Sequence, residues 1–284
     1  MNDITKKGQQ EKENLQQEQL AKNNLPTKKP KQRKTLALRI LAGVMAFLLI
    51  FTILSLANAF VGNPVSVAMA NKEAQRYIDN WYSFLNVQLD KAVYNFKFSE
   101  YIVKARSRDN VDVHFNLYYK NGEIVRDDYA SYVLSGFNTL ERLGQEYSAQ
   151  VTPVLQKYAS FPINEVRIEY DRELLDKASN PFTPGTPFDK NLPIETQLVV
   201  YTDIEERTVE NITKILTEVH KILEEKEYPI SQFGIFAEND GGLVMVHYVT
   251  AEDIESGELK ERLQAALDNL EQHTISVVIH EAQK

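Results

Sequence analysis

Residues 40–57 read Ile-Leu-Ala-Gly-Val-Met-Ala-Phe-Leu-Leu-Ile-Phe-Thr-Ile-Leu-Ser-Leu-Ala, an apolar run without a charged side chain. A helix rises about 1.5 Å per residue, so about 20 mostly apolar residues are enough to cross a bilayer. Leu36–Leu38 and Ala59–Val61 extend the run to that length. The sequence therefore predicts a transmembrane anchor over residues 36–61.

The charges that flank this run predict its direction. Six basic residues shortly precede the run, whereas Lys72 and Arg76 are the first basic residues after it. Basic flanks remain in the cytoplasm. Residues 1–35, rich in Gln, Lys, Glu and Asn, are therefore predicted to be a disordered basic cytoplasmic tail. The protein is then a single-pass protein of the cell membrane with its C-terminal part outside. The six preceding residues are Lys28, Lys29, Lys31, Arg33, Lys34 and Arg39.

A cleaved signal peptide is the alternative interpretation of the same run. Ala57-Asn58-Ala59 has the small-x-small form that signal peptidase accepts, which would place cleavage after Ala59. The apolar run is longer than the roughly 7–15 residues usual in a signal peptide, and the segment before it is also too long. We therefore expect the anchor to be retained. A lipoprotein is excluded, because the chain has no cysteine to acylate.

Charge is distributed unevenly along the chain. The segment 1–39 has ten Lys and Arg against four Asp and Glu, 61–160 has eleven of each, and 161–284 has eleven against twenty-five. An acidic or neutral exterior argues against nucleic acid as a partner. Without cysteine, the part beyond the anchor must fold by core burial alone, and it is long enough for two domains.

Residues 62–160 have the pattern of a first extracytoplasmic α+β module. Asn63-Pro64 starts a helix whose apolar positions continue to Leu85. Three alternating runs, at 94–98, 101–105 and 111–119, predict antiparallel strands, and Asn121-Gly122 predicts a hairpin turn. A long amphipathic helix, Val133–Tyr158, follows and is expected to bend or end near Pro153. The predicted order is helix, antiparallel sheet, helix.

Several short motifs in this part resemble the YfjL-like family. The resemblance implies a membrane-anchored protein of Bacillus-type Gram-positive bacteria, and it assigns no activity. It covers the anchor and the first module, and no motif carries it over residues 161–284. The motifs are Gly62-Asn63-Pro64-Val65-Ser66, Ala70-Asn71-Lys72 with Ala74, Tyr77-Ile78, Tyr94-Asn95-Phe96-Lys97-Phe98 and Asp112-Val113-His114-Phe115.

Residues 161–284 are predicted to be a second, acidic α+β module that folds on its own. A short strand, Glu165–Tyr170, precedes a proline-rich loop over 180–193. A strand–helix–strand pattern then occurs twice, with a turn at Asn239-Asp240-Gly241-Gly242 between the two. Thr250 with Asp253 has the pattern of a capping box before the second helix. This order is that of the ferredoxin-like βαββαβ fold, which hosts many unrelated functions. The predicted strands are Thr196–Tyr201, Ser231–Ala237, Leu243–Val249 and Ile275–Ile279, and the helices span Val209–Leu223 and Leu259–Leu270.

The sequence contains no recognisable catalytic, metal or cofactor motif. The five histidines lack ligand spacing, and the acidic pairs near 205 and 252 fall in first turns of helices, where the helix dipole favours them. Ten of the fourteen tyrosines lie between positions 77 and 158, which fits either a tyrosine-rich core or a groove for sugar or peptide. We therefore predict no catalytic residues, no metal and no cofactor.

One polar sheet face is the best candidate for a ligand site. If the apolar residues of strand 111–119 and of strand 94–98 point inward, their polar residues share the other face. An ordinary solvated surface and a face covered by the second module are the alternatives. The six residues are Asp112, His114, Asn116, Tyr118, Asn95 and Lys97.

These observations favour a non-catalytic binding or interaction module at the cell envelope, with a protein or peptide partner. The alternatives are an envelope-acting hydrolase and an accessory subunit of a membrane complex. A deep pocket of polar groups with perturbed pKa values would favour the enzyme, and a broad apolar patch would favour a partner protein. The sequence leaves the oligomeric state and the ligand open.

Overall fold

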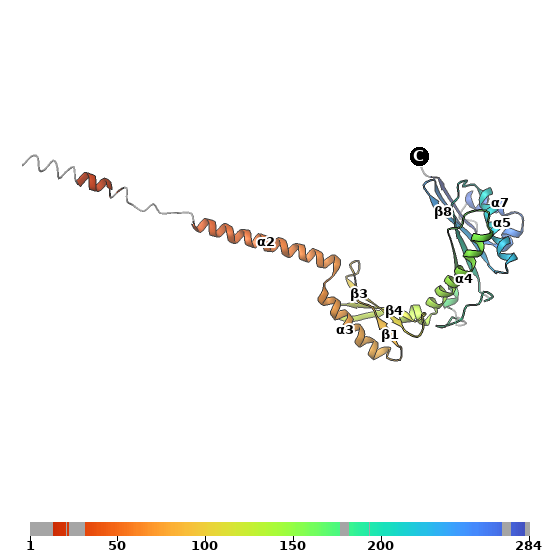
Figure 1. Ribbon diagram of the computed structural model, residues 1–284, viewed down its shortest axis with the longest axis horizontal. Coiled ribbons are helices and arrows are strands. Elements are labelled where there is room, and N and C mark those ends of the chain that lie inside the picture. Colours follow the sequence, from red (N-terminus) through yellow and green to blue (C-terminus); the bar gives the residue numbers. More distant parts are fainter. Residues whose placement is uncertain are drawn as a thin grey trace, which may run out of the picture. The chain divides into compact units, whose positions relative to one another are not determined.

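The computed structural model describes residues 14–20, 22, 32–176, 182–192, 194–268 and 274–281. The chain divides into two compact units (Figure 1). The first unit ends at Val61 and the second begins at Gly62. In the first unit, residues 14–20 are helical, and helix α2 spans Gln32–Val61. Most of the predicted disordered tail lies outside the described residues.

Helix α2 agrees with the predicted anchor in length and composition. Its segment Leu38–Leu56 is long and apolar enough to cross a membrane, and none of it is buried within the protein. Thr52 donates its hydroxyl to the Leu48 carbonyl one turn earlier, at 2.8 Å, so the helix itself satisfies that polar group. The prediction of one membrane-length apolar helix is confirmed.

The second unit, from Gly62 onward, contains two hydrophobic cores, each built on one sheet. Asn63 caps the first helix by accepting the Ser66 N–H at 2.8 Å, and Pro64 occupies the first turn, as predicted. The first sheet is antiparallel with the order β1-β3-β4-β5, and β2 also pairs with β3. Its elements are α3 (Pro64–Trp81), β1 (Val87–Leu89), β2 (Val93–Asn95), β3 (Glu100–Ser107), β4 (His114–Lys120) and β5 (Glu123–Asp127).

Alternation along β3 and β4 places one side of each strand in the first core. Tyr101 pairs with Tyr119, Val103 with Leu117, and Ala105 with Phe115, and all six side chains are buried. They pack with the buried face of α3, Ala70, Ala74 and Ile78. The predicted Asn121-Gly122 turn is confirmed, with φ values of 53° and 101° that fit these two residues best.

Two predicted strands are longer than the observed ones. The run 94–98 was expected to be extended, but β2 ends at Asn95, and residues 96–99 form a turn that contains Ser99 at φ 50°. Strand β4 begins at His114 rather than Val111, and Val111 is 71% exposed. Alternation between apolar and polar residues is not sufficient to define a strand where a tight turn leaves aromatic side chains in solvent.

The long helix, α4 (Phe137–Tyr158), belongs to the second core rather than to the first. Its buried residues Leu143, Tyr147, Val151 and Leu155 are in one cluster with the second sheet. A Cβ at Gly144 would lie 2.5 Å from the Ile168 carbonyl oxygen, so glycine permits this close packing. The boundary expected at 160/161 is therefore better placed near Gly136, and the helix continues through Pro153 to Tyr158.

Between the first sheet and α4, the short helix η1 (Ala130–Leu134) contributes Val133 to the first core. The second sheet has the order β10-β9-β8-β7-β6, in which only β7 and β8 are parallel. The capping box predicted at Thr250 and Asp253 is present. The elements are β6 (Glu165–Tyr170), η2 (Arg172–Asp176), β7 (Thr196–Tyr201), α5 (Val209–Glu225), β8 (Gln232–Asn239), β9 (Gly242–Thr250), α6 (Ala251–Glu255), α7 (Leu259–Asp268) and β10 (Ser276–Glu281).

The predicted ferredoxin-like topology is wrong, although its order of elements along the chain is right. That fold would place β9 between β7 and β8 and would pair the last strand with β7. In the structure β7 pairs with β8 directly, and β6 occupies the other edge of β7. The last strand, β10, therefore pairs with the free edge of β9. Hydrophobic periodicity identified the strands but carried no information on their pairing.

Candidate functional site

Four of the six predicted site residues share one face of the first sheet. On β4, His114, Asn116 and Tyr118 lie opposite Arg106, Lys104 and Ile102 of β3, on the face away from α3. By register, Asn95 joins them through its pairing with Glu100.

The remaining two predicted site residues lie elsewhere. Lys97 lies in the turn after β2, and Asp112 precedes β4 and is buried. The prediction that all six lie on one face is therefore wrong for Lys97 and Asp112, because each lies beyond the end of its strand.

Much of this polar face is used in an internal hydrogen-bond network. The buried carboxylate of Asp128 accepts the Asn116 backbone N–H at 2.5 Å, its side-chain amide at 2.9 Å and the Tyr118 hydroxyl at 3.0 Å. Arg126 stacks over the Tyr118 ring at 3.3 Å and pairs with Glu100. Burial, together with Asp128, raises the pKa of Tyr118 against the opposing effect of Arg126, so its hydroxyl remains a donor. Asn116 and Tyr118 thus help to hold the sheet together.

The tyrosines of the first module form a core cluster. Tyr77 and Tyr82 both donate their hydroxyls to Asp127, at 2.6 and 3.1 Å. Burial and the Asp127 carboxylate raise the pKa of Tyr77 to about 12. Tyr82 packs against Phe115 and Tyr129 with centroids 5.1 and 4.8 Å apart. These contacts support the core interpretation over a sugar or peptide groove.

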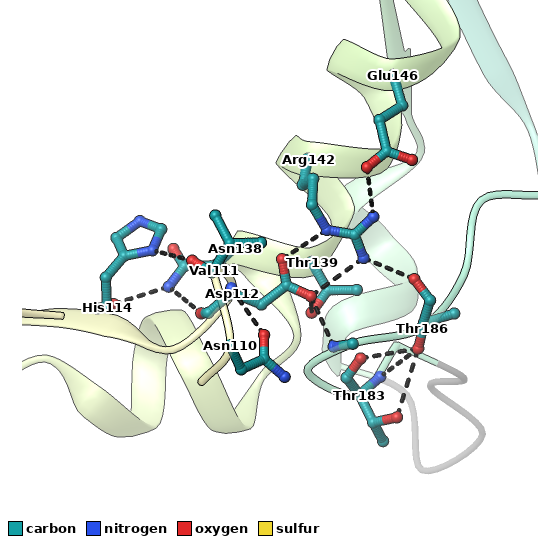
Figure 2. Close-up of polar contacts among 11 residues, drawn as sticks. Asn110, Val111, Asp112, His114, Asn138, Thr139, Arg142, Glu146, Thr183 and Thr186 are labelled. Carbon is teal, nitrogen blue, oxygen red and sulfur yellow. Dashed lines mark hydrogen bonds and ion pairs between the residues drawn. The ribbon is translucent and has the colours of Figure 1, made fainter. Parts of the chain in front are cut away.

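Asp112 is the centre of a buried network that joins the two cores (Figure 2). Arg142 of α4 donates its Nε to Oδ1 at 2.7 Å and its Nη2 to Oδ2 at 3.1 Å. Oδ2 also accepts the Gly185 backbone N–H at 2.7 Å and the Thr139 hydroxyl at 3.2 Å. Asn138 donates its side-chain amide to the carbonyls of Asp112 and His114. The network fixes the loop before β4 against α4 and the loop around residue 185.

The electrostatics of Asp112 are those of a structural ion pair. Burial by itself raises the pKa of this carboxyl, but hydrogen bonds from Arg142, Gly185 and Thr139 outweigh it, and the pKa is lowered. The bonds to Asp112 raise the pKa of Arg142 in turn, so the guanidinium remains charged. Neither group is poised to transfer a proton near neutral pH.

A pocket of about 390 Å³ lies beside this network, and we call it the joint pocket. His114 hydrogen-bonds through its Nδ1 to the Val111 carbonyl at 2.9 Å. Glu141 pairs with Arg172, and Tyr132 packs edge-on against Phe137. In the part of the chain that the structure describes, no hydroxyl in this pocket is bonded to His114. The pocket therefore offers charged, amide and aromatic side chains for contact with a ligand. It is lined by Lys104, Val111, Asp112, His114, Phe115, Asn116, Tyr132, Phe137, Asn138, Glu141, Arg142 and Gln145.

Metal binding finds no support in the described residues, where no group of three or more His, Asp or Glu side chains could hold an ion. His220 pairs with Glu255 at 3.1 Å, and His247 contacts Gln197 at 3.2 Å, so each of these histidines has one polar partner.

The open face of the second sheet carries an apolar row that sequence reasoning missed. Figure 1 shows α4, α5 and α7 on one side of this sheet, where they cover the buried side chains. On the other side, neighbouring strands place Tyr201 opposite Phe236, Phe236 opposite Met245, and Met245 opposite Val278. All four side chains are partly exposed and lie outside the buried core. We call these four residues the open row.

Contacts within the open row keep its side chains against the sheet. The rings of Tyr201 and Phe236 are 5.2 Å apart, and Arg167 lies over the Tyr201 ring at 4.8 Å. The sequence did carry a signal for this row, because Leu243–Val249 is nearly all apolar, with His247 as the exception. Strands of that kind usually have both faces covered.

The fold defines a class: an α+β protein with one membrane-length helix and two sheets in the described residues. Family models match in two segments. The model described as "YfjL-like, N-terminal domain" matches residues 37–128, and "YfjL-like C-terminal domain" matches residues 146–264. The chain belongs to the YfjL-like family, which confirms the predicted resemblance. Comparisons with curated proteins and with solved structures gave no match.

The two family matches agree with the division seen in the fold. The first covers most of α2 and the whole first sheet, and the second begins within α4 and covers β6 to β9. Gly136 lies in the segment between them, at the junction of the two cores.

Proposed function

We propose that this chain is a single-pass membrane protein whose residues 62–284 form a binding module outside the cell, in the envelope of a Gram-positive bacterium. The open row carries the proposal. Apolar side chains on a sheet face that no described helix covers are typical of a surface that binds another protein. A partly exposed aromatic pair at one end of the row, Tyr201 and Phe236, supplies the kind of anchor on which protein interfaces depend.

The charges around the open row narrow the class of partner. The segment 161–284 has eleven basic and twenty-five acidic residues. On β6 the same face continues with the exposed Glu165, Arg167 and Glu169. A partner with an apolar centre and a basic rim would complement this surface, since rim charges guide association and select partners. Nucleic acid does not fit, because a surface of this charge would repel phosphates.

The membrane part of the proposal rests on α2 and its flanking charges. Residues 38–56 are apolar and unburied, and basic residues precede them. A helix of that kind is stable in lipid, and its basic side remains in the cytoplasm. The buried ion pair that joins the two cores also supports a binding role, because a rigid module loses little entropy when it binds.

In-cell photo-crosslinking tests the proposal. A photoreactive amino acid replaces Phe236 in the open row or, as the matched control, Lys221, which is exposed on helix α5. We expect position 236 to capture a discrete protein, identified by mass spectrometry, that position 221 does not capture. The M245D variant with the probe at 236 should lose that product. Equal labelling from 236 and 221 would contradict the proposal. A third probe replaces the exposed Leu48 of α2, and capture from that position alone would favour an accessory subunit.

A further inference from the structure

The turn at residues 96–99 presents aromatic side chains at one end of the first sheet. Phe98 is 63% exposed and Phe96 is 53% exposed, with the exposed Lys97 between them. Turns of this kind usually carry Gly, Pro, Asn, Asp or Ser. The turn is held in place, since Asn95 pairs with Glu100 and Lys120 donates its Nζ to the Phe98 carbonyl at 2.9 Å. A fixed turn that exposes phenylalanine calls for an apolar environment.

The turn lies next to the point at which the chain enters its folded second unit. A Cβ at Gly62 would lie 2.8 Å from Cγ of Tyr94 and 2.7 Å from Oη of Tyr101. The Asn63 backbone N–H donates to the same Tyr101 hydroxyl at 3.0 Å. Tyr94 and Tyr101 face each other one pair away from the turn, with centroids 4.9 Å apart. Gly62 is therefore fixed at the end of the sheet that carries Phe98.

Helix α3 adds further apolar surface close to Gly62 along the chain. Val65 is 69% exposed and Met69 is 49% exposed, one turn apart on the helix, whereas Ala70 and Ala74 are buried. Both lie in the first two turns of α3. The start of this module thus combines exposed phenylalanine, valine and methionine with the basic Lys97 and Lys120.

We propose that the turn 96–99 inserts Phe98 into the interfacial region of the outer membrane leaflet and so docks the first sheet on the lipid surface. This rests on the proposed function, because it requires α2 to cross the membrane. The apolar segment ends at Leu56, and Gly62 follows after about six residues, or about 9 Å of helix. The headgroup region is about 6 Å deep on each side of the hydrocarbon core. The chain thus leaves the bilayer close to the turn.

The chemistry of the turn matches a lipid interface. Aromatic rings concentrate at the boundary between hydrocarbon and headgroups, and lysine side chains can extend from there to the phosphates. Anionic lipids would add electrostatic attraction for Lys97 and Lys120. A second copy of the chain or a partner protein could contact the turn wherever the turn lay on the module. The turn lies beside the point where the chain leaves the bilayer, so the geometry points to the lipid surface as its occupant.

Depth-dependent quenching in the full-length protein provides the test. The single native tryptophan is removed with W81F, and one tryptophan is introduced as F98W, as V111W or as L48W. Position 111 is 71% exposed and lies at the opposite end of β3 and β4, so it is the matched control. The protein is reconstituted in vesicles of phosphatidylcholine, with or without phosphatidylglycerol, brominated near the carbonyl end of the acyl chains for F98W and V111W and near their methyl end for L48W.

We expect L48W and F98W to be quenched and V111W to keep its fluorescence. Quenching of F98W should increase with phosphatidylglycerol, and K97E, which leaves the Lys120 bond to the Phe98 carbonyl intact, should reduce that increase. Quenched L48W with F98W as bright as V111W would overturn this inference and leave the anchor intact. Unquenched L48W would instead overturn the proposed function. A blue-shifted, unquenched F98W would assign the turn to a protein contact and would also reject the lipid surface.

Discussion

The guanidinium of Arg142 contacts both carboxylate oxygens of Asp112, at 2.7 and 3.1 Å, and so connects two hydrophobic cores. The same guanidinium donates to the Thr186 carbonyl at 2.6 Å and to Glu146 at 2.8 Å. Asp112 is 1% exposed and Arg142 is 18% exposed, so water replaces neither partner easily. A buried charge that loses its partner is costly, which makes this pair the sharpest test of how the module is joined.

Substitution of Arg142 by methionine should strongly destabilise residues 62–284. The change leaves the Asp112 carboxylate buried without its cation, for which we expect a loss of about 3–5 kcal/mol in the free energy of unfolding. R167M is the matched control, because Arg167 forms an exposed pair with Glu165 and should cost at most about 1 kcal/mol. Urea denaturation measures both variants. Equal losses in the two variants would show that the Asp112–Arg142 pair does not join the cores.

Acid should weaken the Asp112–Arg142 pair in a defined range of pH. The pKa of Asp112 is lower in the folded protein than its unfolded value of about 3.9, so its contribution to stability is complete above that pH. The contribution is lost as the pH falls from about 4 through the folded pKa. The difference in unfolding free energy between the wild type and D112N should therefore be constant near neutrality and shrink below about pH 4. The control is E165Q, which alters an exposed carboxylate. A difference that grows in acid would be inconsistent with the lowered pKa.

On the polar face of the first sheet, Asp128 and its partners are structural, whereas His114 lies at the surface. D128A should cost about 2–3 kcal/mol, because Asn116 and Tyr118 would lose the acceptor of three hydrogen bonds. H114A should change stability by only about 0.5 kcal/mol, since its Nδ1 contacts one exposed carbonyl. Thermal denaturation compares the two.

If the joint pocket binds a ligand, H114A should lose capture of a cross-linked partner while folding remains intact. Unchanged capture in H114A would remove the joint pocket from the candidate sites.

The smallest independent fragment should include α4. A fragment of residues 161–284 lacks Leu143, Tyr147, Val151 and Leu155, all of which are fully buried against the second sheet. Removal of one large buried side chain costs about 2–5 kcal/mol, so the loss of four should prevent cooperative folding. A fragment of residues 137–284 should give a dispersed NMR spectrum and a cooperative thermal transition. Cooperative folding of 161–284 would restore the boundary to residue 161.

Local signals in the sequence predicted most of the helices and strands. The Asn63-Pro64 start, the Asn121-Gly122 turn and the Thr250–Asp253 capping box each depend on a few neighbouring residues, and all are present. The bounds Glu165–Tyr170 and Thr196–Tyr201 agree with β6 and β7. Such features could be predicted because their physical causes are contained within a few residues.

Long-range relationships could not be predicted in this way. The pairing of β10 with β9 depends on which sheet edge β6 leaves free, and the amphipathic pattern of α4 does not specify which sheet it covers. Asp112 resembled a surface strand residue, and its partners Arg142 and Gly185 are distant in the chain. The open row was visible in part, because Leu243–Val249 lacks a polar face, but the row itself requires the register of four strands.

The direction of the anchor can be tested in intact cells, and the expectation follows from charge alone. Moving the basic cluster that ends with Arg39 across the bilayer is far less favourable than keeping it in the cytoplasm, whereas the second unit starts with few charges. Protease added to intact protoplasts should therefore degrade residues beyond about 62 and leave a protected fragment that contains residues 1–61. In permeabilised protoplasts the tail should also be lost, which controls for protease access. Protection of residues 62–284 in intact protoplasts would show that the orientation is the reverse of the predicted one. A soluble protein that begins at Phe60 in the medium would instead show cleavage after Ala59 and exclude a retained anchor.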